Sequence, residues 1–599
     1  MPDATAPSYA ETAFVNGYEF TQGKGYSLPE YPFITPEEIG SGQTSNHDIV
    51  IVGGGITGLT LACALARLGV KAVLLDEDNT VGVKGASSRG ICYTQKSLEI
   101  FHKLGIYERI AAKGIQWSVG RTFAGSDEVY SFDLAHNSAY NLSTQPPFIN
   151  IQQFYIEGFL VERTLELGAV DIRWKSRVTA LQPDEDGATL SVNTPAGNYR
   201  IRARHVIDAT GAHSQFRGWC QASVTAKKGD DRWCIADVRF STHPPTERHT
   251  WIEAPFNENR AVWQHLMADD VWRIDYQMAP NADPDYVSRE DVVRERLARQ
   301  FGPETGVEIV WVGPYAYKSE CIDRMRHGAV FFMGDSAKVV SPFGARGGNT
   351  GIADADNLAW KLAAVLRGQA AERLLDSYHE ERHEAARENV QVTSRTARYL
   401  RAPEGMERVF RSATIALAKR HAFARQFVNT GRMAVANRYH FSSACSTADG
   451  RSGGISLQNI AFQWSGTGAG ARAAGRRAAP ADRQGVVNDL LKWADGRLLV
   501  LAFGPLTQSA MGKLRQLALS APVRCVQVLD GDSPPQVREH LIDHNANGAG
   551  QLRQGCQISP AKGPRQTAWA VVRPDGYLAA TGSVLNGSLV QAIRTALGM

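Results

Sequence analysis

Several features that mark common protein classes are absent from this chain of 599 residues. Its 8 cysteines form no Cys-x-x-Cys pair and show no metal-ligand spacing, so we expect neither a metal site nor a dithiol redox site. Unpaired thiols of this kind are typical of a reduced, cytoplasmic protein. No run of about 18 apolar residues occurs, and no basic segment followed by an apolar stretch opens the sequence. Membrane insertion and secretion are therefore not expected.

Excess charge of one sign is also scarce. The formal net charge is +4, and the one dense basic segment, residues 472–483, is interrupted by Ala, Gly and Pro. No aromatic side chains alternate with its basic ones, which argues against a nucleic-acid partner. No Ser or Cys nucleophile stands in a recognised catalytic context. The chain is long enough for two or three domains, and its chemistry is left to a bound cofactor.

A dinucleotide-binding pattern is present near the N-terminus. Residues 47–77 predict a buried strand, a Gly-x-Gly-x-x-Gly turn, a helix and a second strand. In this pattern Gly53 makes the tight turn, Gly55 lets the backbone approach a pyrophosphate, and Gly58 permits close packing of helix on strand. An acidic residue about 20 positions later bonds a ribose hydroxyl. The expected cofactor contacts are Gly53, Gly55, Ile56, Thr57, Gly58, Asp76 and Glu77, and NAD and FAD both fit at this point.

A second segment, residues 333–362, suits a flavin nucleotide. A strand end delivers the acidic Asp335, which can accept a hydrogen bond from a ribityl-type hydroxyl, and a Pro- and Gly-rich loop leads into an amphipathic helix near Asn349. The unpaired N–H groups at a helix start would stabilise negative charge on a reduced flavin. The expected contacts are Asp335, Pro342, Gly347, Gly348, Asn349 and Thr350. The two segments lie about 280 residues apart, as expected if they hold the two halves of FAD, which favours FAD over NAD.

By these motifs the chain resembles the group A flavoprotein aromatic monooxygenases, in the long branch that includes phenol, 3-(3-hydroxyphenyl)propionate and 2-hydroxybiphenyl hydroxylases. Positions that match the family's flavin motif are Gly347, Asn349, Thr350, Gly351, Asp354, Ala355, Asn357, Leu358, Trp360, Lys361 and Leu362. Departures from the family pattern are Thr210, Lys338, Ser341, Ala345, Arg346 and Gly348. Thr210 stands where the family has an Asp linked to FAD and to the nicotinamide donor, so the preference between NADH and NADPH stays open.

The resemblance implies further site residues. Arg89 would contact the FAD phosphates, Gln153 the flavin chain, and Val178 would also contact the cofactor. Arg273 resembles a family arginine beside the flavin that helps the ring move between buried and exposed positions. Candidates for contact with a phenol are Asp275, Tyr276 and His265, which share a hairpin with Arg273. Whether the substrate is acidic or neutral is not decided, because the basic residues of this region (Arg232, Arg239, Arg248, Arg260 and Arg273) could all face water.

The fold class implied is α/β. A Rossmann-type FAD-binding domain carries an inserted β-sheet substrate domain, as in p-hydroxybenzoate hydroxylase, and is followed by a thioredoxin-like C-terminal domain that lacks Cys-x-x-Cys. The expected divisions are an N-terminal arm (1–46), the first FAD-binding part with a β-meander (47–230), the substrate-roof sheet (231–320), the second FAD-binding part with long helices (321–449) and the thioredoxin-like domain (450–599).

The function implied is an FAD-dependent monooxygenase that uses NAD(P)H and O2 to hydroxylate a phenolic or related aromatic compound. The resemblance implies a flavin C4a-hydroperoxide as the oxidant, a hydroxyl added ortho to an existing one, and a homodimer. Two alternatives stay open: a flavin oxidoreductase or Baeyer–Villiger-type enzyme on the same fold, and a non-catalytic flavin sensor. The expected partners are a small aromatic substrate and O2.

Overall fold

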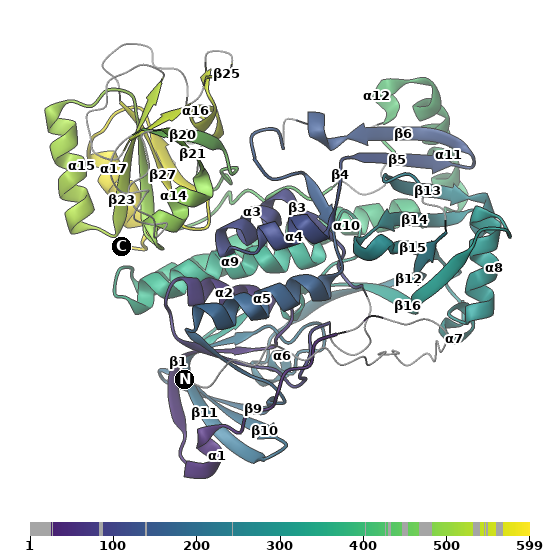
Figure 1. Cartoon of the computed structure of the whole chain (residues 1–599), viewed down its shortest axis with the longest axis horizontal. Coiled ribbons are helices and arrows are strands. Elements are labelled where there is room, and N and C mark those ends of the chain that lie inside the picture. Colours follow the sequence, from purple (N-terminus) through teal and green to yellow (C-terminus); the bar gives the residue numbers. More distant parts are fainter. Residues whose placement is uncertain are drawn as a thin grey trace.

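The computed structural model describes residues 26, 28–82, 88–137, 140–241, 244–401, 403–425, 427–428, 433–445, 453–465, 482–530, 540–543, 545–546, 549–558 and 567–599. Three sheets organise these residues (Figure 1): one at the bottom of the view, one at the right, and one at the upper left that belongs to the C-terminal part of the chain. The long helix α9 (Gly347–Leu366) runs through the middle, between the sheet at the bottom and the C-terminal domain.

The first sheet contains the dinucleotide-binding strands. Its order is β17 (Arg326–His327), β18 (Val330–Phe332), β11 (Gly197–Asp208), β1 (Ser45–Val52), β2 (Ala72–Leu75) and β8 (Val170–Arg173), and β18, β11, β1, β2 and β8 run parallel. The inner residues of these strands are buried, as in a parallel sheet covered on both faces. A hairpin of β9 (Arg177–Asp184) and β10 (Gly187–Thr194) pairs with β11, with turns between Asp184 and Gly187 and between Thr194 and Gly197, and it forms the expected β-meander.

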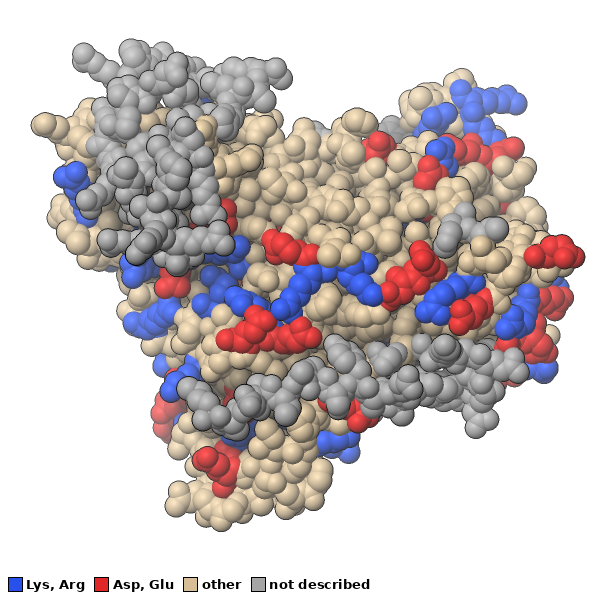
Figure 2. All heavy atoms as spheres, viewed as in Figure 1, with Lys and Arg blue, Asp and Glu red and all other residues tan. Residues whose placement is uncertain are grey.

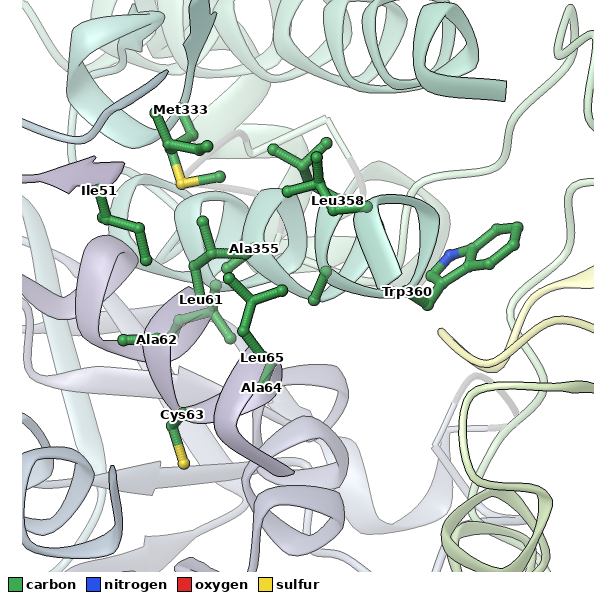
Figure 3. Close-up of a cluster of buried hydrophobic side chains, with 14 of the residues drawn as sticks. Ile51, Leu61, Ala62, Cys63, Ala64, Leu65, Met333, Ala355, Leu358 and Trp360 are labelled. Atoms are coloured by element: carbon green, nitrogen blue, oxygen red, sulfur yellow. The ribbon is translucent and has the colours of Figure 1, made fainter. Parts of the chain in front are cut away.

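Two helices bring the two sequence motifs together. Helix α2 (Ile56–Arg67) follows the glycine turn and α9 follows the second motif, and the two pack against each other. Figure 3 shows Leu61 of α2 next to Ala355 of α9, with Leu65 on the same side of α2. Small and branched apolar side chains allow this close approach. Segments about 280 residues apart in sequence are therefore fixed side by side.

The second sheet forms the roof. Its order is β19 (Lys338–Val339), β16 (Val307–Ile322), β12 (Val224–Phe240), β15 (Trp272–Gln277), β14 (Arg260–Leu266), β13 (Arg248–Ala254), β5 (Val119–Ala124) and β6 (Asp127–Asp133). The roof therefore extends beyond the expected residues 231–320. Strands β5 and β6 come from the region assigned to the first FAD-binding part, and β5 joins β13 in parallel. Such long-range pairing has no local sequence signature.

The third sheet lies in the C-terminal domain. Its order is β21 (Asp482–Val486), β20 (Ala461–Ser465), β24 (His540–Asp543), β23 (Val523–Asp530), β22 (Leu498–Phe503), β27 (Ala568–Val572) and β28 (Leu578–Gly582). Strands β22, β23 and β24 are parallel, whereas β27 is antiparallel to β22 and to β28. Helix α15 (Gln508–Ser520) connects β22 to β23, and α17 (Gly587–Ala596) follows β28.

Buried ion pairs fix the C-terminal domain to the flavin-motif helix. Arg573, directly after β27, pairs with Glu381 of α10 (Asp376–Leu400) at 2.5 Å, and Lys361 of α9 reaches the same carboxylate at 2.8 Å. All three side chains are fully buried. Trp360 of α9 lies beneath the Arg573 guanidinium, 5.3 Å from the ring centroid. The domain is thus attached to α9 by charges that water does not screen.

The remaining helices pack on the faces of the sheets or against other helices. They are α1 (Glu37–Ser41), α3 (Gln95–Leu104), α4 (Tyr107–Lys113), α5 (Gln153–Leu167), α6 (Phe216–Trp219), α7 (Pro284–Val287), α8 (Glu290–Phe301), α11 (Gly405–Arg420), α12 (Ala422–Arg425), α14 (Val487–Ala494) and α16 (Gln551–Gly555). Three short strands, β3 (Cys92–Thr94), β7 (Phe148–Asn150) and β4 (Ile115–Trp117), form a separate sheet, and β25 (Asn545–Ala546) pairs with β26 (Ala549–Gly550).

The surface carries charges of both signs (Figure 2), and the described residues show neither a membrane-spanning helix nor a metal-binding group. Figure 2 shows acidic and basic side chains interspersed across one face of the molecule. All eight cysteines are free thiols. Among the described residues, no helix combines the length and hydropathy needed to cross a bilayer. Within the same part of the chain, no group of three or more His, Cys, Asp and Glu side chains is arranged to hold a metal ion.

Candidate cofactor and substrate site

The β1–α2 turn forms a cradle that a side chain would fill. Gly53 has φ 108°, and a Cβ there would lie 2.4 Å from the Ala209 carbonyl oxygen. A Cβ at Gly58 would lie 1.9 Å from the carbonyl oxygen of Gly53. At Gly55 a Cβ would meet nothing within 4 Å, so this position opens onto space beside the start of α2. An anion such as a pyrophosphate fits there, against the first N–H groups of the helix.

Asp76 is held against this turn. Its carboxylate accepts hydrogen bonds from the backbone N–H of Gly54 at 2.5 Å and of Asp78 at 2.8 Å. Burial raises the pKa of Asp76 to about 7 despite these two bonds. The neighbouring Glu77 is about half exposed and forms an ion pair with Arg177 at 3.6 Å. The structure therefore places the Asp76 carboxylate against the turn, bonded to two backbone N–H groups, and its contact with a ribose hydroxyl stays a prediction.

Other expected cofactor residues surround the cradle in different ways. Gln153, the first residue of α5, accepts a hydrogen bond from the Gly90 N–H at 3.2 Å and donates one to Glu157 at 2.7 Å. Glu157 accepts from the Gly82 N–H at 2.8 Å, so this pair supports the segment that carries Arg89. Arg89 is exposed and has φ 48°. The side chain of Val178 is buried in the core, so only its backbone could contact a cofactor.

Thr57 separates the two motifs rather than facing the cradle. A Cβ at Gly334 would lie 2.6 Å from the Thr57 hydroxyl oxygen, and a Cβ at Gly351 would lie 2.3 Å from it. Only glycine fits at these two positions of the second motif. Ile56 is also buried, within the core of the dinucleotide-binding sheet. Both side chains are used in packing, so cofactor contact through the backbone of this turn stays a prediction.

Asp335 lies at the start of the second motif, near the cations Lys338, Arg89 and Arg217. It follows β18 in a short 3-10 turn, and its side chain is exposed. The surrounding protein raises its pKa by desolvation, and the nearby cations Lys338, Arg89 and Arg217 oppose that shift. Arg217 donates to the carbonyl oxygen of Asp335 at 2.8 Å and thereby fixes the turn. An exposed carboxylate in a cationic cleft suits a ribityl hydroxyl, as the sequence predicts.

The start of α9 offers backbone groups rather than side chains. Asn349 accepts a hydrogen bond from the Thr94 N–H at 2.9 Å and donates to the Cys92 carbonyl at 2.8 Å. Thr350 accepts from Arg382 at 2.9 Å, on the side of α9 that faces α10. Both side chains are therefore used to hold the helix in place. The N–H groups of Gly347, Gly348 and Asn349 precede the first intrahelical bond, from the Thr350 N–H to the Arg346 carbonyl, and are the ones that we expect a flavin to use.

The family departures have local explanations. Lys338 forms a fully buried ion pair with Asp354, whose other oxygen accepts from Arg382 at 2.7 Å. Arg346 is buried and donates to Asn389 at 2.6 Å. Ala345 has φ 57°, a backbone conformation that favours the glycine usual in the family. These residues replace one set of internal contacts by another and leave the cleft in place.

The roof sheet presents a polar face toward the segment that carries Arg89. Asp237 of β12, Arg273 of β15 and His265 of β14 are register partners across adjacent strands, so their side chains point to the same face. Arg273 donates to Asp275 at 2.9 Å and to the carbonyl oxygen of Arg89 at 2.5 Å. This second bond joins the roof to the FAD-binding segment. Burial and the cations Arg248 and Arg273 lower the pKa of His265 well below its usual value, so His265 is neutral.

Tyr276 lies on the opposite face. It follows Asp275 on the same strand, and side chains alternate along a strand. Its hydroxyl donates to Gln300 of α8 at 2.7 Å, and its ring belongs to the apolar cluster beneath that helix. Contact of Tyr276 with a substrate in the cleft is therefore not supported. Asp275, by contrast, is buried beside Arg273 on the cleft face.

The structure adds site residues that the sequence did not single out. Tyr26 of the N-terminal arm donates from its hydroxyl to Asp237 at 2.8 Å, and burial raises the pKa of Asp237 to about 6. Trp263 packs edge-on against Phe343, with ring centroids 4.8 Å apart, and so connects β14 to the loop before α9. Arg248 of β13 lies over Trp263. The available signal was weak: a polar residue at an inward position of an alternating strand.

Comparison with known proteins agrees with this geometry. The family model described as FAD binding domain matches residues 46–393. Rifampicin monooxygenase of Streptomyces venezuelae is 30% identical over 344 residues, which is 57% of this chain and 69% of that protein. The 3-(3-hydroxy-phenyl)propionate/3-hydroxycinnamic acid hydroxylase of Mycolicibacterium smegmatis is 26% identical over 356 residues, 59% of this chain. The match spans 61% of that hydroxylase, less than two thirds of its length.

Solved structures share the fold. The flavin-dependent monooxygenase PieE, in complex with FAD and substrate, aligns with a TM-score of 0.73 and 21% identity over 92% of this chain and 99% of PieE. A ternary complex of aklavinone-11 hydroxylase with FAD and aklavinone aligns with a TM-score of 0.69 and 22% identity over 93% of this chain and 100% of that one. The open cradle at Gly55, the exposed Asp335 and the start of α9 fit FAD. The chain belongs to the FAD binding domain family, and its cofactor is FAD.

Proposed function

We propose that this protein is an FAD-dependent monooxygenase that uses NAD(P)H and O2 to hydroxylate an aromatic substrate, ortho to an existing hydroxyl. The observation that supports this most directly is the bond from Arg273 of the roof to the carbonyl oxygen of Arg89. It closes a buried polar face over the cleft that carries both FAD motifs. Named relatives that hydroxylate aromatic compounds or oxygenate other molecules support the same reaction class.

The residues of the chain have separable roles in this proposal. Bound FAD would supply electron transfer to O2 and delivery of one oxygen atom. The first N–H groups of α9 would stabilise negative charge near the ring. Trp263 and Phe343 form an apolar wall that excludes water, and His265 and Asp275 are the polar groups that could orient a phenol. Neutral His265 can accept a hydrogen bond from a phenolic hydroxyl, although its lowered pKa makes it a weak base.

The test is made on the purified FAD-loaded protein. NADH and NADPH oxidation would be followed with a panel of phenols, together with hydrogen peroxide release and product mass under ¹⁸O2. We expect at least one phenol to accelerate oxidation and to gain one labelled oxygen with little peroxide. Acceleration that ends only in peroxide, or no acceleration by any phenol, would contradict the proposal. Oxygen inserted beside a ketone would support the Baeyer–Villiger alternative, and product without label would support the oxidoreductase. Bound FAD without turnover would support a sensor.

The C-terminal domain is proposed to be thioredoxin-like and structural. The order β23–β22–β27–β28, with α15 between the two parallel strands and α17 at the end, supports that topology. No cysteine pair suited to dithiol exchange is present in the sequence. The buried pairs of Arg573 with Glu381 support a role in holding α9 and α10.

We also propose a homodimer formed through α11. Its exposed face carries Met406, Phe410 and Leu417, which are 79%, 68% and 46% exposed. Acidic Glu407 lies near the start of this helix and basic Arg420 at its end. Two copies related by a two-fold axis would therefore pair antiparallel with opposite charges in contact. Sedimentation equilibrium tests this: a dimer that Phe410→Asp dissociates is expected, and a wild-type monomer at micromolar concentration would contradict it.

A further inference from the structure

Arg248 is a buried cation that forms no direct ion pair with a carboxylate of the described residues. It is 4% exposed, and burial lowers its pKa from the usual value, although Asp275 lies near enough to raise it. Its contacts within the described part of the chain are a weak bond from Nη1 to the Met433 sulfur at 3.2 Å and the face of Trp263, 4.9 Å from the ring centroid. Its Nε has no hydrogen-bond partner there. A buried charge in this condition is costly unless an anion joins it.

Two unpartnered polar atoms accompany this guanidinium. Because His249 pairs with Gln264 in the antiparallel β13–β14 ladder, Arg248 is the cross-strand neighbour of His265. The Nδ1 of His265 and the indole Nε1 of Trp263 are both buried without a hydrogen-bond partner in the described structure. Buried polar groups are normally paired, so three adjacent exceptions indicate a ligand. The ligand must accept hydrogen bonds, since the guanidinium and the indole can only donate.

The other roof arginines named in the sequence analysis each have a carboxylate within 4 Å or are exposed. Arg273 pairs with Asp275 at 2.9 Å, Arg239 with Glu308 at 3.3 Å, and Arg260 with Glu258 at 3.7 Å. Arg232 is exposed. Among these five roof arginines, only Arg248 is both buried and without a direct ion pair in the described structure. Arg248 also lies near the second FAD motif, because Trp263, which it covers, packs against Phe343 in the loop before α9.

We propose that Arg248, with Trp263 and His265, binds an anionic group of the substrate, so that the preferred substrates are aromatic acids rather than neutral phenols. This substrate class rests on the proposed monooxygenase function. A carboxylate suits the site best, because it can accept two parallel hydrogen bonds from one guanidinium. Arg248 acts here in recognition, at the end of the site away from Arg273, and takes no part in oxygen transfer.

The test measures binding and needs no turnover. The FAD-loaded protein would be titrated with three matched pairs of probes of increasing size, each an acid and its neutral primary amide: 3-hydroxybenzoate, 3-(3-hydroxyphenyl)propionate and 3-hydroxy-2-naphthoate. Dissociation constants come from flavin absorbance changes and tryptophan fluorescence at low chloride. We expect at least one acid to bind about 10- to 100-fold more tightly than its amide, the range for hydrogen bonds to a charged group.

Variants separate recognition from folding. Arg248→Met should remove the preference by weakening the acid about 10- to 100-fold while the amide changes little, and Arg248→Lys should keep part of it. Arg239→Met is the matched control, since it removes a roof arginine that pairs near the surface. If Arg248→Met does not retain FAD, chloride competition against the acid in the wild type makes the same distinction. Equal affinity for acids and amides, or no binding by any acid, would overturn the proposal.

This result can be distinguished from failure of the proposed function. Acid-selective binding lost in Arg248→Met, with no labelled product from any probe, would keep the anion site and reject oxygenation. Labelled product from neutral phenols, with no acid preference, would keep oxygenation and reject the site. The anion bound by Arg248 could instead belong to FAD itself. In that case Arg248→Met lowers the affinity for FAD, and acids and amides bind the wild type with equal affinity. That result also rejects the substrate site.

Discussion

Replacing Arg573 by Met is expected to destabilise the protein strongly, although Arg573 lies in the C-terminal domain. Its guanidinium donates to both oxygens of Glu381, at 2.5 and 2.8 Å, and to both oxygens of Asp575, at 3.1 and 2.5 Å. All of these side chains are buried. Methionine keeps the apolar stem over Trp360 but removes the charge. Two buried carboxylates would then share the single cation of Lys361.

The magnitude follows from this loss of compensation. Breaking one buried ion pair costs about 3–5 kcal/mol, and Arg573 serves two, so we expect at least that range. The expected effect depends on pH. Arg573 holds the pKa of Glu381 well below its usual range, and that of Asp575 is lowered by the same cation. This stabilisation is present above the unfolded carboxyl pKa of about 4 and is lost as pH falls through the folded values. The difference between wild type and variant should therefore narrow at about pH 3.

The assay is urea unfolding of the FAD-loaded protein at pH 7, followed by circular dichroism and tryptophan fluorescence. Arg524→Met is the matched control, because Arg524 also belongs to the C-terminal domain but contacts the Trp493 ring at 5.1 Å in place of a carboxylate. We expect the control to cost less than about 1 kcal/mol. If Arg573→Met costs no more than the control, the buried pairs do not hold the domain on α9 and the reasoning is wrong.

Three further predictions concern the cofactor cleft and the roof. Gly55→Ala should leave the apoprotein folded but weaken FAD binding at least about tenfold, because its Cβ meets no protein atom and points into the cradle. Gly58→Ala should also lower the thermal stability of the apoprotein, since its Cβ would lie 1.9 Å from the Gly53 carbonyl oxygen. Equal effects of the two variants in thermal melts and FAD titrations would contradict this. The pKa of Asp76 is raised to about 7 in the folded chain, so its contribution to apoprotein stability is present below the unfolded pKa of about 4 and is lost as pH rises through 7. Asp76→Asn should therefore make the urea midpoint depend less on pH between those two values. An unchanged dependence would refute the assignment. Tyr276→Phe should cost about 1 kcal/mol through loss of its bond to Gln300 while NAD(P)H oxidation with substrate is unaffected; a large loss of substrate stimulation would place Tyr276 in the site after all.

The flavin motifs could be predicted from the sequence because they depend on local chemistry. Gly53, Gly58 and Asp335 could be placed because the strand, the turn and the helix start around them depend on a few neighbouring residues. The hairpin of β14 and β15 was also visible, since the residues between its strands carry a turn signal. Once strand β15 was located, alternation fixed Arg273 and Asp275 on one face. The same alternation places Tyr276 on the other face, although the sequence alone does not say which face meets the cofactor.

By itself, then, the sequence determined the cofactor class, the two FAD motifs and the order of the sheets along the chain. Only the tertiary structure decided which side chains meet across distant segments. Tyr26 reaches Asp237, β5 joins the roof, and Arg573 reaches Glu381 across 192 residues. It also decided that Arg248 is buried with no direct ion pair among the described residues, whereas Arg273 is paired with Asp275. The physical reason is that burial and pairing of a charge depend on long-range packing, which residue type and local periodicity do not encode.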